Sequence, residues 1–197
     1  MIEFKYKGED LYARMEEAVE RVNIRLRRAV EVFERQKIPY AVVGGYAVRA
    51  WVAQVDKAAL RTTADVDILI RPEDLPRTIA AMTAAGFHYR QTAGVDMFVE
   101  TPDGSARDAV HLVLCGQMIR ANDLDPNPDL DPLTRAEEFN TISFEALVRM
   151  KLNSFRDKDR MHLRDLISLG LVDASWLDRL PVGHRERLKN LLDDPNG

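Results

Sequence analysis

The chain has 197 residues, 46% of them hydrophobic and 30% charged, a balance typical of globular proteins that bury a sizeable core. Its formal net charge of -4 excludes an overall basic field of the kind that draws proteins to nucleic acid or anionic membranes, although a local basic groove is compatible with it. The single cysteine, Cys115, excludes an internal disulfide framework and a cysteine-cluster zinc site, and its apolar neighbours predict a core residue.

Charged residues interrupt the first ten positions of the chain, which predicts that it carries no signal peptide. No apolar run reaches the roughly 20 residues that a membrane-spanning helix needs. We therefore expect a cytoplasmic protein with no membrane partner.

Residues 9–36 contain neither Gly nor Pro and carry apolar side chains at three- and four-residue intervals, the spacing of an amphipathic helix. The apolar positions are Leu11, Met15, Ala18, Val22, Leu26, Val30 and Phe33. Pro39 ends this helix, and residues 40–44 have the composition of a short buried strand. A second helix is predicted over 45–58, where Val48, Trp51, Val52 and Val55 mark one face.

The remaining elements alternate before the pattern becomes helical. A strand over 64–70 precedes a helix that opens near Pro72 and closes at Gly86. Further strands are predicted over 87–91, 95–101 and 106–114, with a turn at residues 102–104. From Thr141 the chain is expected to be helical, with breaks near 156–158, at Gly170 and at 181–183.

These elements predict an α/β (α+β) fold, a mixed twisted sheet with flanking helices and a C-terminal helical region. The expected division is an N-terminal helix packed on the core (1–37), an α/β core (38–140) and a C-terminal helical region that completes the cleft (141–197).

Asp65 and Asp67 are unusual because they stand in an otherwise apolar strand. Residues i and i+2 of a strand point to the same face, about 6.6 Å apart, so both carboxylates project side by side. Adjacent carboxylates repel each other, and one takes up a proton unless a cation lies between them. Mg²⁺ suits this demand, because it prefers a few carboxylate oxygens completed by water and phosphate.

Gly44 and Gly45 lie between a predicted strand and a predicted helix, and they could bind the phosphate that a Mg²⁺ ion at Asp65 and Asp67 would accompany. Without β-carbons, their backbone amides can approach a phosphate at the positive end of the helix. A Gly-Gly turn alone is commonly a tight turn, and Asp-x-Asp alone is commonly a solvated face. Together, and with Arg61 and Thr63 just before the aspartates, they favour a nucleotide site.

The segments GGYAVRAW (44–51) and RTTADVDILI (61–70) resemble the DNA polymerase β-type nucleotidyltransferase superfamily, whose pattern is a Gly-Gly or Gly-Ser turn, a helix and Asp-x-Asp on the next strand. The presence of Arg61 and Thr63 before the aspartates is similar to a bacterial branch of uncharacterised and toxin–antitoxin-like nucleotidyltransferases. Residues 151–171, KLNSFRDKDRMHLRDLISLGL, resemble the lysine- and aspartate-bearing helices of that branch. The resemblance covers roughly residues 38–172 and implies a nucleotidyltransferase-like fold.

The resemblance also implies roles for the residues that match it. Gly44 and Gly45 would hold the triphosphate of an NTP, and Asp65 and Asp67 would bind the catalytic Mg²⁺ or Mn²⁺ ions. Two departures from the family pattern are visible in the sequence. The second turn residue is Gly45 where the family often has Ser, and the 19 residues between Gly45 and Asp65 (46 through 64) exceed the usual spacing.

A third acidic residue on a later strand is also implied, and Asp108 is the candidate for this catalytic and metal-binding position. Asp96 and Glu100 remain alternatives. His111 is expected to lie outside the metal site, because it would point opposite to Asp108 on a shared strand.

Lys151 falls on the apolar face of its helix, four residues from Leu147 and from Phe155. A lysine in this position either binds an anion or extends to the water at the edge, and the resemblance favours a phosphate contact. Asp165, on the following helix, is expected to pair with Lys151 when no nucleotide is bound. The predicted nucleotide-binding residues are therefore Gly44, Gly45, Arg61, Thr63, Lys151 and Asp165.

Residues 123–134 imitate a calcium loop, with oxygen-bearing side chains at alternate positions. The sixth position of such a loop needs Gly and the twelfth a bidentate Glu, whereas this chain has Pro128 and Thr134. We therefore predict a surface loop that could form a rim or lid of the cleft.

Two functions follow from these observations. The first is an enzyme that transfers a nucleoside monophosphate from a metal-bound NTP, such as ATP, to an acceptor hydroxyl. The second is a catalytically silent nucleotide- or protein-binding module of the same fold, similar to an antitoxin. The acceptor (tRNA, protein or small molecule), the base and the oligomeric state stay open, although the acidic net charge argues against a large polynucleotide.

Overall fold

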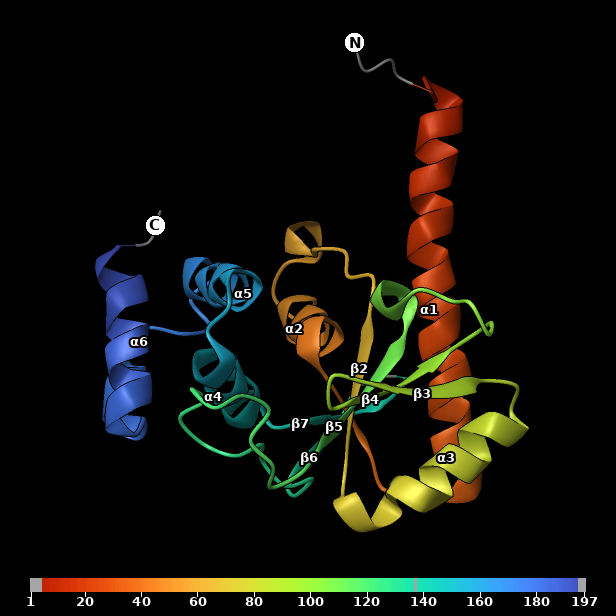
Figure 1. The fold of residues 1–197 in the computed structure, drawn as a ribbon. Coiled ribbons are helices and arrows are strands. Elements are labelled where there is room, and N and C mark those ends of the chain that lie inside the picture. The colour runs from red at the N-terminus through yellow and green to blue at the C-terminus, as the bar shows by residue number, and fades with distance from the viewer. Residues whose placement is uncertain (1–4, 137, 195–197) are drawn as a thin grey trace.

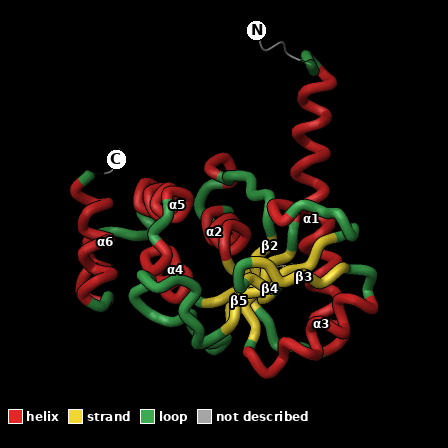
Figure 2. The backbone as a smooth tube through the Cα atoms, in the orientation of Figure 1, coloured by secondary structure: helices red, strands yellow, loops and turns green. Residues whose placement is uncertain are grey.

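The structure, a computed structural model, describes residues 5–136 and 138–194. A seven-stranded sheet lies at its centre, and helices cover both faces of this sheet (Figure 1, Figure 2). The strands are β1 (Ala41–Val43), β2 (Val66–Ile70), β3 (His88–Thr92), β4 (Val95–Val99), β5 (Val110–Leu114), β6 (Leu133–Arg135) and β7 (Asn140–Ile142). The α-helices are α1 (Glu9–Gln36), α2 (Gly44–Val52), α3 (Leu75–Ala84), α4 (Phe144–Ser154), α5 (Asp157–Ser168) and α6 (Val182–Asp193).

The sheet is mixed, as predicted, with the strand order β3-β4-β5-β2-β1-β7-β6. The central strand β2 runs antiparallel to β1 and parallel to β5. Because parallel strands need a long crossover, the chain between β2 and β5 passes through α3 and the β3–β4 hairpin. β7 joins β1 in parallel, and β6 closes that edge of the sheet.

The sheet separates two apolar cores, and alternate residues of β2 belong to different cores. Val66, Ile68 and Ile70 pack with the residues of α1 and α3, whereas Leu69 packs with those of α2, α4 and α5. Asp67 shares its face with Leu69, because successive strand residues point to opposite sides. The carboxylate of Asp67 therefore lies on the side of the sheet that α2 and the C-terminal helices cover.

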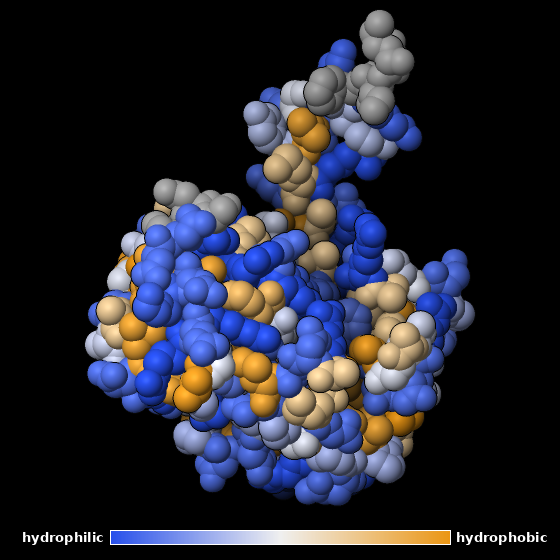
Figure 3. All heavy atoms as spheres, turned by 60° about the vertical axis from the view of Figure 1, so that its left-hand side comes forward, coloured by the Kyte–Doolittle hydropathy of each residue, from blue (hydrophilic) through white to orange (hydrophobic). Residues whose placement is uncertain are grey.

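The first helix has the predicted bounds, but only its C-terminal half packs against the sheet. Burial begins at Val22, whereas Leu11 is 39% and Met15 58% exposed. The N-terminal half projects beyond the sheet in Figure 1, and Figure 3 shows apolar side chains on this projecting part. Helical periodicity marks the apolar face of a helix but does not show how far along the helix the rest of the fold extends.

Several predicted boundaries differ from those in the structure. The helix predicted over 45–58 ends at Val52, and Val55 is 53% exposed, because Asp56 starts a separate 3-10 turn by accepting a hydrogen bond from the amide of Ala58. The strand predicted over 106–114 starts only at Val110. The short strands β6 and β7 were not predicted, since three-residue strands carry almost no periodic signal.

The C-terminal region is helical, as predicted, and its breaks fall near the expected residues. α4 begins after Ser143, whose side chain accepts a hydrogen bond from the amide of Ala146. α4 ends at Ser154, the next residue, Phe155, has a left-handed φ of 46°, and α5 begins at Asp157. Within the part of the chain that the structure describes, no helix combines the length and the apolar character required to cross a membrane.

The uneven packing of α1 can be tested with one substitution at two sites. Leu26 is 3% exposed and Leu11 is 39% exposed on the same helix. Leu26→Ala should lower the free energy of unfolding by about 2–5 kcal/mol, because it leaves a cavity, whereas Leu11→Ala should change it by less than about 0.5 kcal/mol. Urea denaturation measures both values. Equal losses would show that the N-terminal half is also packed in solution.

Candidate functional site

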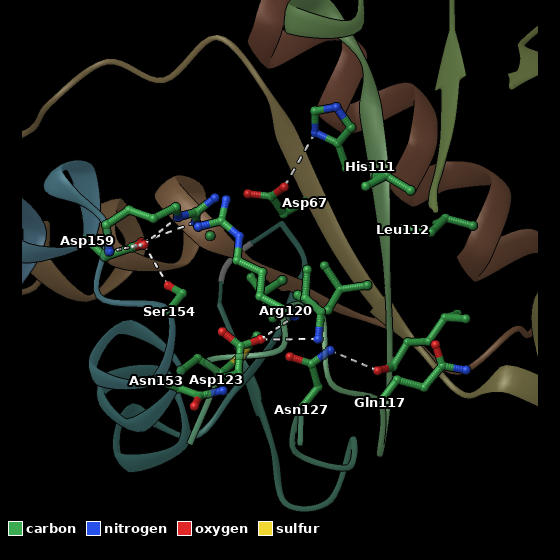
Figure 4. A pocket seen from close by; sticks show the side chains of 18 of the residues that line it. Asp67, His111, Leu112, Gln117, Arg120, Asp123, Asn127, Asn153, Ser154 and Asp159 are labelled. Carbon is green, nitrogen blue, oxygen red and sulfur yellow. Dashed lines mark hydrogen bonds and ion pairs between the residues drawn. The ribbon is translucent and has the colours of Figure 1, made fainter. Parts of the chain in front are cut away.

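A cavity of about 580 Å³ lies beside the start of β2 and along β5 (Figure 4). Segments that are distant in sequence form its wall. They are the β1–α2 junction, the start of β2 with the residue before it, the β3–β4 turn with the start of β4, the strand β5, the loop that follows β5, and the corner between α4 and α5. This loop contains Asp123 and Asn127, so the segment that imitates a calcium loop forms part of the cavity rim.

Asp65, Asp67 and His111 meet at one end of this cavity. Asp65 immediately precedes β2, Asp67 is the second residue of β2, and the strand register pairs Asp67 with His111 of β5. One ligand atom from each of the three side chains lies within 4.8 Å of the other two. Two carboxylates and an imidazole this close together are a donor set that binds divalent cations, so these residues fit a metal ion.

In the structure, basic side chains lie against both carboxylates: Lys158 beside Asp65, and His111, which is cationic only when its ring is protonated, beside Asp67. Asp65 accepts hydrogen bonds from the Thr63 hydroxyl (2.7 Å) and the Lys158 ammonium (3.3 Å). Burial alone would raise the pKa of Asp65, but these two contacts outweigh it and the pKa lies below its ordinary value. The Nδ1 atom of His111 lies 3.5 Å from Asp67 Oδ1, and this contact outweighs burial and raises the pKa of His111.

Gly44 is required at its position for two independent reasons. Its φ of +67° lies in the left-handed region that glycine adopts most readily. A β-carbon on residue 44 would also lie only 1.9 Å from Asp67 Oδ2. A β-carbon on Gly45 would lie 2.8 Å from the Thr63 hydroxyl oxygen, so Thr63 fills the space that a serine at position 45 would need.

Asp159 organises the corner between α4 and α5. Its carboxylate accepts hydrogen bonds from Lys151 Nζ (2.9 Å), Ser154 Oγ (2.6 Å) and Arg156 Nε (2.7 Å). Burial would raise the pKa of Asp159, but the Lys151 charge and these hydrogen bonds hold the pKa well below its usual range. Lys151 therefore has Asp159 as its partner, whereas the sequence predicted Asp165.

Arg61 and Asp165 form a separate ion pair, with distances of 2.5 and 2.9 Å between their side chains. Together with Gly45 and Thr63, both residues line a small second recess rather than the main cavity. Thr63 connects the two places, because its hydroxyl also donates to Asp65. The structure thus brings Gly44, Asp65, Asp67 and Lys151 into one cavity and places Arg61 and Asp165 in the second recess.

His111 was expected to lie outside the metal site, whereas its imidazole lies beside Asp67, and Asp108 does not lie where it was expected. Asp108 is exposed in a 3-10 turn before β5, and it is not among the described residues that line the cavity. The predicted alternation from Asp108 to His111 assumed one continuous strand, whereas β5 starts at Val110. Glu100 pairs with Arg25 and Arg28 of α1 instead.

Asp96, the other alternative, lines the cavity, but its carboxylate accepts hydrogen bonds from Tyr89 and Gln91 of the neighbouring strand β3. The candidate metal ligands among the described residues are therefore Asp65, Asp67 and His111. The pairing of Asp67 with His111 across β2 and β5 is the signal that would have identified the histidine, and strand register is not visible in a single sequence.

Four basic side chains line the cavity: Arg120, Lys151, Arg156 and Lys158. Lys151 and Arg156 bind Asp159, and Lys158 binds Asp65. Among these described side chains, Arg120 is the one whose guanidinium makes neither a hydrogen bond nor an ion pair. Its loop is held in place because Asp123 accepts hydrogen bonds from the amides of Ile119 and Arg120. The sequence pattern did not indicate Arg120 or Lys158.

A family model described as an uncharacterised nucleotidyltransferase matches residues 10–138. The chain belongs to this nucleotidyltransferase family. The matched region includes the carboxylate pair and His111, and the α4–α5 corner lies outside it. None of the curated proteins compared with this nucleotidyltransferase matches it.

Two solved structures with TM-scores above 0.5 show the same fold at low sequence identity. A nucleotidyltransferase-like antigen of Paracoccidioides brasiliensis is 20% identical, with 89% of each chain covered and a TM-score of 0.57. A provisionally assigned nucleotidyltransferase of H. pylori is 13% identical and covers 92% of this chain and 79% of its own, with a TM-score of 0.53. The antibiotic-resistance factor ANT(2'')-Ia is 12% identical, with 87% and 82% covered and a TM-score of 0.47.

The close contact between Gly44 and Asp67 can be tested against a matched glycine. Gly170 has a φ of +69°, but a β-carbon there would meet nothing within 4 Å. Gly170→Ala should cost about 1–2 kcal/mol for the left-handed backbone alone. Gly44→Ala should cost more and should also weaken Mn²⁺ binding, because the β-carbon displaces the Asp67 carboxylate. Chemical denaturation and calorimetry measure the two effects. If Gly44→Ala and Gly170→Ala lower the free energy of unfolding equally, and Gly44→Ala leaves the Mn²⁺ affinity unchanged, the close contact between Gly44 and Asp67 is contradicted.

Proposed function

We propose that this nucleotidyltransferase transfers a nucleoside monophosphate from a metal-bound NTP to an acceptor hydroxyl. The observation that carries the proposal is the arrangement of the main cavity. Asp65, Asp67 and His111 lie at one end of it, and four basic side chains line the same space. Polyanions such as triphosphates bind where cationic side chains converge with a metal site.

Asp65 and Asp67 would hold the divalent cation, Mg²⁺ or Mn²⁺, with His111 as a further donor. When bound, such cations activate the acceptor oxygen and stabilise the departing pyrophosphate. The amides at the start of α2 are free to bind phosphate, because the first amides of a helix have no partner within it. Gly44 keeps this helix end open on the cavity side.

The basic side chains would bind the rest of the triphosphate. Arg120 is best placed for this role, because its guanidinium has no protein partner among the described residues. Lys158 is 43% exposed, so its ion pair with Asp65 is weak enough to exchange the carboxylate for phosphate. Lys151 is only 5% exposed and bound to the buried Asp159, which favours a positioning role in which it fixes the start of α5.

The proposed acceptor is a molecule that presents a hydroxyl group, and three chemical classes meet this requirement. A tRNA end, a protein hydroxyl and a small molecule each provide the required nucleophile, and ATP is the first NTP to test. ANT(2'')-Ia has been crystallised with adenylyl-2''-tobramycin, a nucleotidylated small molecule. Incubation of this protein with each labelled NTP, Mg²⁺ or Mn²⁺ and a cell lysate would identify the acceptor.

One observation favours the second function, a silent binding module of the same fold. Lys158 compensates Asp65, and His111 compensates Asp67 when its imidazole is protonated, in both cases without a metal ion. A module whose aspartates are permanently paired in this way would be stable and would not need nucleotide.

Substitution of the two aspartates separates the enzyme from the silent module. Asp65→Asn and Asp67→Asn should each lower turnover at least about 100-fold, or about 2.7 kcal/mol of activation free energy, because they weaken the metal site. Their thermal stability should change little, because relief of like-charge repulsion offsets the lost ion pairs. Nucleotide incorporation and thermal melts, with and without Mg-NTP, measure the two effects.

The matched control is Asp129→Asn, which removes an exposed carboxylate that pairs with Arg71 outside the cavity and should leave turnover unchanged. The transferase is wrong if the two cavity variants melt several degrees lower while nucleotide shifts no melting temperature, including that of the wild type.

A further inference from the structure

His111 introduces a nitrogen donor into a site that otherwise offers only oxygen atoms. Its Nδ1 atom lies 3.5 Å from Asp67 Oδ1, and Figure 4 shows the imidazole directed toward the carboxylate of Asp67, its register partner across β2 and β5. The side chain is 19% exposed, close to the 20% of Asp67, so both are accessible from the cavity. An all-carboxylate site would have an oxygen in this position.

The other ring nitrogen of His111 determines which atom faces the metal site. Nε2 lies 2.9 Å from the backbone carbonyl oxygen of Ala106, and a carbonyl oxygen can only accept a hydrogen bond. Nε2 therefore carries the proton in the neutral ring, and the lone pair is on Nδ1, toward Asp67. Metal-ligating histidines characteristically donate their second N–H to a carbonyl or carboxylate in this way, which fixes the tautomer and the orientation of the ring.

Regular secondary structure positions both the carbonyl of Ala106 and the His111–Asp67 pair. Ala106 begins the 3-10 turn before β5, and the Ser105 side chain caps this turn by accepting a hydrogen bond from the amide of Arg107. His111 itself lies in β5, directly paired with Asp67 in β2. The imidazole is thus oriented by the backbone on one side and by strand register on the other, before any ion arrives.

We propose, on the basis of the nucleotidyl transfer proposed above, that Asp65, Asp67 and His111 form a mixed carboxylate–imidazole site that selects Mn²⁺ over Mg²⁺. Mg²⁺ prefers an octahedron of oxygen ligands. Imidazole best suits the later first-row ions, and Mn²⁺ shares the preference of Mg²⁺ for carboxylate, water and phosphate oxygens, but as a first-row transition ion Mn²⁺ tolerates one nitrogen ligand better than Mg²⁺ does. The nitrogen of His111 therefore shifts the preference toward Mn²⁺, while the triphosphate oxygens remain suitable ligands.

The test compares metal preference in the wild type with that in His111→Asp and His111→Asn. Calorimetry with MnCl₂ and with MgCl₂, in the presence and in the absence of a non-hydrolysable NTP, gives the ratio of the two affinities. His111→Asp should lower the Mn²⁺ to Mg²⁺ affinity ratio by on the order of 10- to 100-fold and should keep or improve Mg²⁺ binding. His111→Asn preserves the neutral charge and should weaken Mn²⁺ without improving Mg²⁺, which guards against misfolding of the three-carboxylate variant.

A spectroscopic measurement adds a readout that does not depend on turnover. Pulsed EPR of bound Mn²⁺ should show modulation from a coordinated ¹⁴N nucleus in the wild type, and this modulation should vanish in both variants. An unchanged affinity ratio in His111→Asp, or wild-type Mn²⁺ without nitrogen modulation, would overturn the selectivity. Loss of turnover in His111→Asn at unchanged Mn²⁺ affinity would also overturn it, because the imidazole would then act on the acceptor rather than on the metal.

The two proposals fail in different ways. If no NTP binds with either metal, the transferase is wrong, and the nucleotide-free titrations still decide the metal preference. If NTP binds and turns over equally well with Mg²⁺ and Mn²⁺ in the wild type and in His111→Asp, only the metal preference is wrong.

Discussion

The carboxylate of Asp67 lies where the β-carbon of any residue other than glycine at position 44 would have to be, and the rest of the site depends on this contact. The register of β1 and β2 pairs Val43 with Asp67, so the chain must turn directly over the carboxylate at Gly44. The first turn of α2 then begins beside Asp67, and His111 approaches Asp67 from the opposite strand. The carboxylate of Asp67 therefore lies next to the start of α2, the carboxylate of Asp65 and the imidazole of His111.

Electrostatics explain why the remaining elements meet at the same place. Two neighbouring carboxylates need nearby positive charge, and α5 provides Lys158 for Asp65. α5 is positioned in turn by its own buried ion pair, since Asp159 near its start binds Lys151 of α4. Removal of Asp159 would leave the buried ammonium of Lys151 without this partner, at a cost of about 3–5 kcal/mol, whereas Asp159 would keep Arg156 if Lys151 were removed. The helical region is therefore a structural part of the candidate metal site.

The predictable part of the site is the part with a strong local signal. The residues of the Gly-Gly turn and the Asp-x-Asp strand are close in sequence, and the alternation of the strand alone places both aspartates on one face. His111 was missed because its role depends on the pairing between β2 and β5, across more than 40 residues of chain. Lys158 and Arg120 were missed because exposed basic residues on a helix and a loop carry no periodic signal.

The fold, like the site, has features that the sequence predicts and features that it does not. The bounds of α1 follow from apolar periodicity, but its unpacked N-terminal half does not, because the pattern continues past the edge of the sheet. Lys151 was correctly placed on a buried helical face, whereas its partner was misassigned, since Asp159 and Asp165 both lie on the following helix. The sharp corner at Phe155 brings the start of α5 against α4, so Asp159 rather than Asp165 reaches Lys151. This corner is a tertiary feature that the sequence pattern does not show.

The most direct test of this account is a crystal structure of the protein grown with Mn²⁺ and a non-hydrolysable NTP, with anomalous scattering measured near the manganese absorption edge. The account predicts an anomalous peak bound by Asp65, Asp67 and Nδ1 of His111, a triphosphate against the start of α2 and Arg120, and Lys158 released from Asp65. A bound nucleotide with no anomalous peak at the aspartates, or with Lys158 still on Asp65, would contradict it.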